Sequence, residues 1–160
     1  MPNGKGNVKM GESFLYFAYG CALNQTLVEF RINQAVKLVG KGELKNYVLK
    51  FNRKNPDGSA RANLFYSEND FVLGVIYKVG KNKFEQLAQT EPEYQLTSFS
   101  ILTQEGPIEA FAFICKHYQD GIVPDKKDVL RIAEYARSYD FPQSYIDKIL
   151  SALPQPAVVT

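Results

Sequence analysis

The amino-acid sequence predicts an α+β fold, and two observations lead to that expectation. Short apolar runs separated by turn residues follow one another through the middle of the chain, as in a sheet of many strands. Helical apolar patterns gather mostly near the end of the chain instead of alternating with the strands. With 160 residues, of which 45% are apolar and 22% charged, the chain has the size and composition of one globular domain.

The chain opens as a strand, a glycine turn and a helix. Residues 14–19 form an aromatic and apolar run that stops at Gly20, which is typical of a buried strand. Asn24 is suited to cap the helix that follows. The apolar stripe of that helix consists of Leu27, Val28, Ile32 and Ala35. Residues 1–12 are polar and glycine-rich, and they predict a disordered arm.

Strand-like segments with turn signals fill the middle of the chain. The expected strands lie over residues 36–44, 47–52, 60–67 and 71–79. Gly40 and Gly42 predict a bend in the first of them. The Asn-Pro-Asp-Gly sequence at 55–58 is a strong turn signal, and residues 68–70 are expected to connect a hairpin.

The later elements are expected to complete a single domain over residues 13–154. The strands lie over 96–103 and 108–116, and the helices over 81–90, 125–139 and 142–153. No internal repeat or interdomain linker interrupts this order, and residues 155–160 are expected to form a tail.

The composition excludes several kinds of catalytic site. The chain has only two cysteines, Cys21 and Cys115, and one histidine, His117. These numbers exclude a disulfide framework and a histidine-rich metal site. If the protein is an enzyme, its chemistry is expected to depend on carboxylates, hydroxyls and backbone amides, with no metal and no cofactor.

The net charge of +2 is unevenly distributed, because residues 1–80 carry +5 and residues 81–160 carry −3. The basic excess consists mainly of Lys37, Lys41, Lys45, Lys50, Arg53, Lys54 and Arg61. Such a surface can steer an anion or a polynucleotide. The basic residues are dispersed, however, and Glu43 and Asp57 interrupt them. This favours a solvated strand surface and no nucleic-acid partner.

The sequence also predicts where the protein is found. No apolar run approaches the ~20 residues that span a bilayer, and the polar beginning of the chain lacks the apolar core of a secretion signal. We therefore expect a cytoplasmic protein with reduced thiols and no membrane partner. The pattern makes no prediction about the oligomeric state.

Glu91 is a charged residue at a position where the helical pattern predicts an apolar one. In the helix predicted over 81–90, Phe84, Leu87 and Ala88 define an apolar stripe on which the next position is Glu91. A carboxylate at the edge of the core is partly desolvated. Because desolvation disfavours the charged form, such a group suits general acid–base chemistry. The alternative is a glutamate at a helix end that points to solvent.

The turn at residues 19–22 is the second candidate site. It lies between a strand end and a helix start, where backbone N–H groups converge and favour an anion. Gly20 allows a ligand to approach closely, and the same amides can activate a thiolate at Cys21. A covalent cysteine mechanism lacks an obvious base, because His117 is remote in sequence.

Several segments of the chain resemble segments of the gamma-glutamylcyclotransferase-like proteins, and they follow one another along the chain as they do in that family. The segment 14–20 is similar to their opening aromatic strand, which leads into Tyr-Gly-Ser-Asn. The segment 71–77 resembles their Val-x-Gly-Val-Val-Tyr strand, and 87–91 resembles their Leu-Asp-x-x-Glu helix end. Tyr94 matches a tyrosine that follows. Further similar segments are 44–52, 60–64 and the closing helices around Tyr135, Phe141 and Tyr145.

The resemblance implies a mixed sheet curled into a small barrel, with flanking helices and a pocket at its mouth. It also implies a metal-independent transferase or cyclising lyase of glutathione metabolism. In that reaction the α-amine of a γ-glutamyl amide or peptide attacks its own γ-carbonyl, which gives 5-oxoproline and a free amine. Glu91 matches the catalytic acid/base. The implied substrate-binding positions are Tyr19, Gly20, Cys21, Ala22, Leu23 and Tyr94.

The chain also departs from the family pattern. Cys21 and Ala22 stand where the family has Ser-Asn, and Asp128 stands where one branch has a substrate-binding tyrosine. The leaving amine is therefore left open among a peptide, an amino acid, ε-linked lysine and a biosynthetic amine. The alternative function is a non-catalytic module that binds a small anionic or γ-glutamyl-like ligand.

Overall fold

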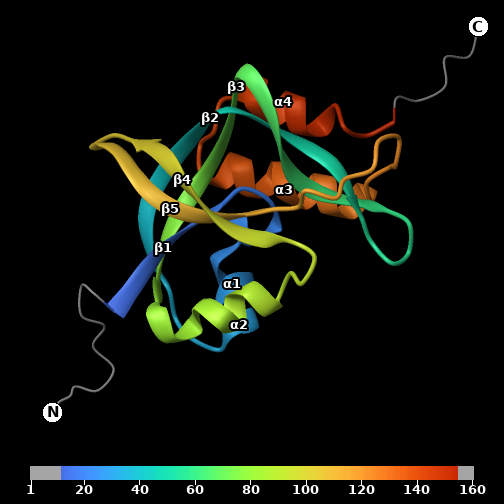
Figure 1. Ribbon diagram of the computed structural model, residues 1–160. Coiled ribbons are helices and arrows are strands. Elements are labelled where there is room, and N and C mark those ends of the chain that lie inside the picture. Colours follow the sequence, from blue (N-terminus) through green and yellow to red (C-terminus); the bar gives the residue numbers. More distant parts are fainter. Residues whose placement is uncertain (1–11, 155–160) are drawn as a thin grey trace, which may run out of the picture.

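A closed barrel of five strands forms the centre of the computed structural model, which describes residues 12–154 (Figure 1). The strands follow the order β1-β3-β2-β4-β5 around the barrel. Their bounds are β1 Ser13–Ala18, β2 Lys37–Lys54, β3 Ala60–Gly80, β4 Gln95–Thr103 and β5 Gly106–Ile114. Neighbours are antiparallel, except that β1 meets β5 in parallel at Tyr16 and Phe111. The expected mixed sheet curled into a small barrel is confirmed.

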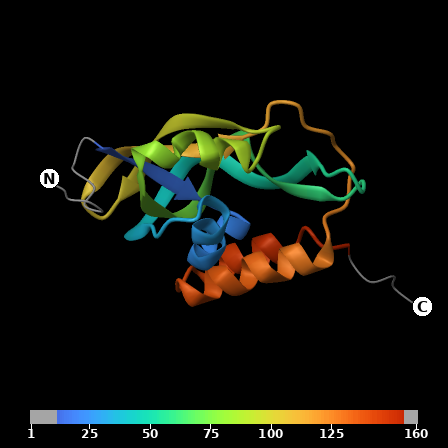
Figure 2. The ribbon, with the colours of Figure 1, turned by 90° about the horizontal axis from the view of Figure 1, so that it is seen from below.

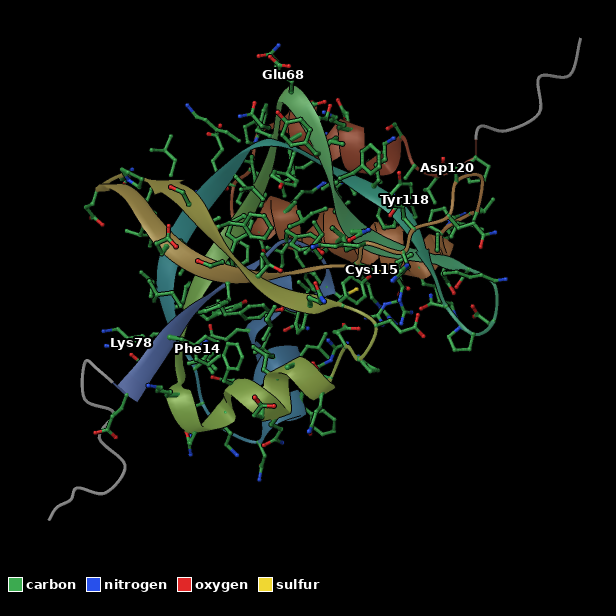
Figure 3. All side chains as sticks on the ribbon, viewed as in Figure 1. Phe14, Glu68, Lys78, Cys115, Tyr118 and Asp120 are labelled. Atoms are coloured by element: carbon green, nitrogen blue, oxygen red, sulfur yellow. The ribbon has the colours of Figure 1, made fainter. Side chains whose placement is uncertain are left out.

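Four α-helices flank the barrel. They are α1 Gln25–Ile32, α2 Phe84–Gln89, α3 Lys126–Ser138 and α4 Gln143–Leu150. Figure 2 shows α3 and α4 side by side beneath the barrel, with α1 next to them. Helix α2 lies beside α1 at one end of β1, where Phe14 and Phe84 place their ring centroids 5.0 Å apart (Figures 1 and 3).

The segment after β1 folds as the sequence predicts. A 3-10 turn, η2 (Cys21–Leu23), leads into α1, and Asn24 caps that helix by accepting a hydrogen bond from the Thr26 N–H at 3.1 Å. Val28 and Ile32 of the expected stripe are buried, and Leu27 is half-buried. The inclusion of Ala35 in that stripe is wrong, because α1 ends at Ile32, where Asn33 takes up a left-handed conformation, and Ala35 is exposed. The cap fixes where the loop after β1 ends and therefore how residues 19–22 face the barrel.

The hairpin expected at residues 68–70 is wrong. β3 runs unbroken from Ala60 to Gly80, and both of its halves pair with β2. Residues 60–66 pair with 47–54, and residues 71–78 pair with 37–45. Figure 3 shows Glu68 at the apex of β3, pointing away from the barrel. Because β2 offers a partner on both sides of this point, the turn residues bulge outward instead of reversing the chain.

The strands expected separately over 36–44 and 47–52 form one strand, β2, with a register shift between Lys45 and Tyr47. The other predicted elements are confirmed. A 3-10 turn, η3 (Lys81–Lys83), precedes α2, and β4 and β5 form the expected antiparallel pair. Asp125 caps α3 by accepting a hydrogen bond from the Lys127 N–H at 2.8 Å. The predicted stripe of α3 is buried and consists of Val129, Ile132, Ala133 and Ala136. Pro142 stands one position before α4 and not within its first turn.

The core has two clusters, one inside the barrel and one between the barrel and the helices. Close approach of β1 to β3 depends on Gly74, because a Cβ there would lie 2.3 Å from the Ala18 carbonyl oxygen. None of the helices in residues 12–154 has the length and apolar character needed to span a bilayer. The arm and tail expected at the two ends fall on residues 1–11 and 155–160, outside the described residues, and the single-domain extent stays a prediction.

Candidate active site

A small cavity of about 60 Å³ is bordered by the connection after β1, the end of α1, the start of β3 and the turn after α2. Residues of β1, β2, β5 and α3 line it as well, and Asp128 of α3 is one of them. Six of the seven residues predicted for the site line this cavity: Tyr19, Gly20, Cys21, Ala22, Glu91 and Tyr94. A larger groove of about 390 Å³ between β2 and α4 contains none of them.

Glu91 is buried, as its position on the apolar stripe predicts. Only 6% of the residue is exposed. Helix α2 ends at Gln89, and Glu91 lies in the turn that follows. The Glu91 N–H donates to the Ala88 carbonyl at 3.3 Å, and the Glu91 carbonyl accepts from the Tyr94 N–H at 2.9 Å. This turn directs the carboxylate into the cavity and away from solvent.

The two carboxylate oxygens of Glu91 have different surroundings. Oε2 accepts hydrogen bonds from Arg61 Nη2 at 2.5 Å and from Arg31 Nη1 at 3.2 Å. Oε1 is buried and has no hydrogen-bond partner among residues 12–154. A buried acceptor without a partner costs about 1–3 kcal/mol. One oxygen is thus anchored, and the other is left for a donor that a ligand can supply.

The sequence did not predict the two arginines for the site. Arg31 comes from the last turn of α1 and Arg61 from the start of β3, and each side chain is 29% exposed. Burial opposes the charge on Arg61, but Glu91 and Tyr94 outweigh burial, so the pKa of this guanidinium is raised. An arginine at a helix end or strand start is ordinary, and no periodicity singles it out.

The basic stretch read as a solvated strand surface is only partly so. Arg53 is 5% exposed, lies 5.4 Å from the Tyr94 ring centroid and forms an ion pair with Glu93 at 3.4 Å. The Arg61 guanidinium lies 5.8 Å from the same ring. Two of the basic side chains expected at the surface are therefore held around Tyr94.

The loop after β1 brings three of its four predicted residues to the cavity. Gly20 lies close to β3, since a Cβ on it would be 3.4 Å from the Ala62 Cβ. Leu23 does not line the cavity, because it closes the η2 turn. Its N–H donates to the Gly20 carbonyl at 2.9 Å, and its carbonyl accepts from the Tyr77 hydroxyl at 3.0 Å. The Leu23 amide is therefore engaged within the protein.

Both predicted tyrosines use their hydroxyls within the fold. The Tyr19 hydroxyl donates to the Phe113 carbonyl at 2.7 Å, and the Tyr94 hydroxyl donates to the Ala62 carbonyl at 2.6 Å. They therefore form walls of the cavity and do not offer free donors to it. Tyr16, which the sequence did not predict, lines the cavity too. Burial, followed by the charge of Glu91, raises the pKa of its hydroxyl.

Several known proteins of similar sequence, and one solved structure of similar fold, are named gamma-glutamylcyclotransferase. The gamma-glutamylcyclotransferase of Bos taurus is 29% identical over 159 residues, which cover 90% of this chain and 81% of that protein. The gamma-glutamylcyclotransferase of Homo sapiens is 27% identical over 154 residues, with 89% of this chain and 80% of that protein covered. A solved structure named gamma-glutamyl cyclotransferase superposes with a TM-score of 0.81 at 24% identity, covering 93% of each chain. No protein-family model matches the chain.

In sequence the chain is similar to the gamma-glutamylcyclotransferases, and its fold is similar to a structure of that name. The barrel brings its β1 loop next to Glu91, so the two candidate sites found separately in the sequence line one cavity. Within residues 12–154, no three His, Cys, Asp or Glu side chains gather closely enough to hold a metal ion.

Cys21 is not arranged as a nucleophile in this cavity. Burial raises the pKa of its thiol, and the charge of Asp128 adds to the effect. A protonated thiol is a poor nucleophile. His117 is exposed and does not line the cavity, so it does not serve as the base. The geometry favours the carboxylate over the thiol as the reactive group.

Proposed function

We propose that this protein is a γ-glutamyl cyclotransferase, which converts a γ-glutamyl amide or peptide into 5-oxoproline and a free amine. Glu91 acts as the general acid/base, and no metal or cofactor takes part. The observation that carries the proposal is the buried, unpartnered Oε1 of Glu91 in a cavity beside the Gly20 loop. The α-ammonium group of a γ-glutamyl substrate supplies the donor that this oxygen lacks.

In the proposed reaction Glu91 carries protons between two nitrogens of the substrate. Oε1 takes one proton from the α-ammonium, and the freed amine attacks the γ-carbonyl carbon. A new C–N bond forms, and the carbonyl oxygen becomes an oxyanion. Glu91 then protonates the leaving nitrogen, and the old C–N bond breaks. In total the α-nitrogen loses two protons, and the leaving nitrogen, released as an ammonium, gains two.

The other parts of the site stabilise the bound substrate and its oxyanion. No turn or loop carbonyl in residues 12–154 accepts from the N–H groups of Cys21 and Ala22. These amides are available to bind the α-carboxylate or the developing oxyanion. Because they belong to the backbone, the replacement of Ser-Asn by Cys-Ala does not remove them. The tethered amine supplies much of the rate acceleration through its effective concentration.

The test is Glu91→Gln, with Glu93→Gln as the matched control. Glu93 is two residues away, 69% exposed on its side chain and outside the cavity. Release of 5-oxoproline from γ-glutamyl amino acids, peptides and amines is measured for each protein. We expect a loss of about 10²–10⁴-fold in kcat for Glu91→Gln and wild-type rates for Glu93→Gln.

Two further measurements keep this test decisive. Glu91→Asp keeps the charge that pairs with Arg31 and Arg61 but withdraws the carboxylate from the cavity, so it is also expected to lose activity. Wild-type turnover by a folded Glu91→Gln protein would exclude Glu91 as the acid/base. The ion pairs that occupy Oε2 favour a second candidate, a binding module without turnover. Ligand binding with no 5-oxoproline from any substrate would establish that function instead.

A further inference from the structure

The cavity beside Glu91 is smaller than the group proposed to enter it. Its volume of about 60 Å³ is well below the ~300–1,000 Å³ that small-molecule pockets usually enclose. A γ-glutamyl group that enters beside Glu91 is therefore expected to displace a side chain that lines the cavity.

Arg61 is well placed to be that side chain. Backbone hydrogen bonds to Ala88 and Tyr94 hold Glu91 in its turn. The Arg61 guanidinium, by contrast, stands at the end of a long side chain that is 29% exposed. Within residues 12–154 the guanidinium forms its ion pair with Glu91, and it also lies 5.8 Å from the ring centroid of Tyr94. It can swing away from Glu91 without disturbing the backbone of β3.

Arg61 also lies beside the Gly20 loop. The Cβ of its strand neighbour Ala62 approaches the position that a Cβ on Gly20 would occupy to 3.4 Å. Cys21 and Arg61 line the same cavity. A guanidinium that turns from Glu91 toward the loop approaches the available N–H groups of Cys21 and Ala22. Together they provide donors for an anion next to a glutamate.

We propose that Arg61 recognises the α-carboxylate of the substrate by exchanging ion-pair partners, an inference that rests on the proposed cyclotransferase function. In the empty site Arg61 pairs with Glu91. When a γ-glutamyl group enters, its α-ammonium pairs with Glu91 and its α-carboxylate pairs with Arg61. Arg61 and Glu91 each face an opposite charge before and after the exchange, so neither side chain is left as an uncompensated buried charge.

The exchange selects for a zwitterionic head group. A ligand with a neutral α-carboxamide would separate Arg61 from Glu91 without supplying a counter-charge, and an unpaired charge in a partly buried site is costly. Arg31 keeps its hydrogen bond to Oε2 in both states. It therefore serves as a positioning residue that holds the Glu91 carboxylate while Oε1 receives the ammonium.

The test compares two head groups on the wild-type protein and on three variants. Binding of L-glutamine and of its α-amide, L-glutaminamide, is measured by calorimetry. Turnover is measured as release of the leaving amine from a γ-glutamyl dipeptide with a free or an amidated α-carboxylate. For the wild type we expect a preference of about 10–100-fold for the free carboxylate in both Kd and kcat/KM.

The variants separate recognition from positioning. Arg61→Gln is expected to weaken only the carboxylate ligands and so to abolish the preference, while Arg61→Lys keeps the charge and part of the preference. Arg31→Gln, the matched control, is expected to weaken both head groups alike. Equal losses for both head groups in Arg61→Gln would overturn the proposal, because a residue that merely orients Glu91 gives that result.

Failure of this inference differs from failure of the proposed function. Turnover without any preference for the carboxylate would reject the role of Arg61 and leave the reaction standing. Carboxylate-dependent binding through Arg61 without turnover would reject the reaction and support the recognition. Thermal unfolding checks each variant. If Arg61→Gln does not fold, Arg61→Lys provides the test. Because lysine lacks the forked pair of donors, Arg61→Lys should show a smaller preference for the free carboxylate than the wild type. An equal preference in the two proteins would overturn the proposal.

Discussion

The hydroxyl of Tyr77 anchors the loop that borders the candidate active site, and its removal gives a sharp prediction. Tyr77 is fully buried, and its hydroxyl lies 3.0 Å from both the Ala22 and the Leu23 carbonyl oxygens. In Tyr77→Phe the Leu23 carbonyl keeps the Tyr139 hydroxyl at 3.1 Å. The Ala22 carbonyl has no second donor among the described residues. One buried acceptor is therefore left without a partner.

The cost follows from that single acceptor. Because phenylalanine keeps the ring, no large cavity forms, and an unsatisfied buried acceptor costs about 1–3 kcal/mol. At about 2–4 °C per kcal/mol for a chain of this size, a loss near the middle of that range lowers Tm by about 4–8 °C. The freed loop also misplaces the Cys21 and Ala22 amides, so we expect kcat/KM for 5-oxoproline release to fall about tenfold or more.

Tyr145→Phe is the matched control. The Tyr145 hydroxyl accepts from the Leu73 N–H at 3.0 Å, on the side of β3 that faces α4, and Tyr145 does not line the active-site cavity. Its loss should lower Tm by a similar amount and leave kcat/KM unchanged. Assays well below both Tm values separate the two effects. Wild-type kcat/KM in Tyr77→Phe, or an equal loss in Tyr145→Phe, would refute the reasoning.

Three further predictions concern stability and thiol chemistry. The Asn63 side-chain amide forms hydrogen bonds of 2.9 Å with both the N–H and the carbonyl of Cys115. Asn63→Ala removes both, so urea denaturation should show that the free energy of unfolding falls by about 3 kcal/mol. An unchanged denaturation midpoint would contradict this. Gly74→Ala brings a Cβ within 2.3 Å of the Ala18 carbonyl oxygen, so Tm should fall sharply. An unchanged Tm would contradict the register of β1 against β3. Burial and Asp128 raise the pKa of the Cys21 thiol, so its alkylation should rise at a higher pH than that of free cysteine; mass spectrometry showing fast alkylation at neutral pH would argue against it.

Local signals in the sequence were sufficient for most elements of the fold. Asn24 and Asp125 mark helix starts because their side chains satisfy exposed N–H groups of the first turn, an interaction within a few residues. The turn signal at residues 68–70 failed for the opposite reason. Whether such a segment reverses the chain or bulges depends on which strand lies beside it, and that partner, β2, is distant in sequence.

The residues of the candidate site likewise differ in whether a local signal identifies them. Glu91 could be found because an acid on an apolar stripe is an anomaly that one helix reveals by itself. The Gly20 loop could be found because a strand end, a glycine and a cap stand next to one another. Arg31 and Arg61 are ordinary in their own elements, and they lie 60 and 30 residues from the glutamate that they contact.

The burial of Glu91 nevertheless implies that such partners exist. A carboxylate that is 6% exposed either loses its charge or is paired, because an isolated buried charge is costly. In the first half of the chain the basic residues outnumber the acidic ones, so a compensating cation was available there. The burial of Glu91 thus predicts a basic partner from that half of the chain, and the fold, by bringing the end of α1 and the start of β3 together, selects Arg31 and Arg61.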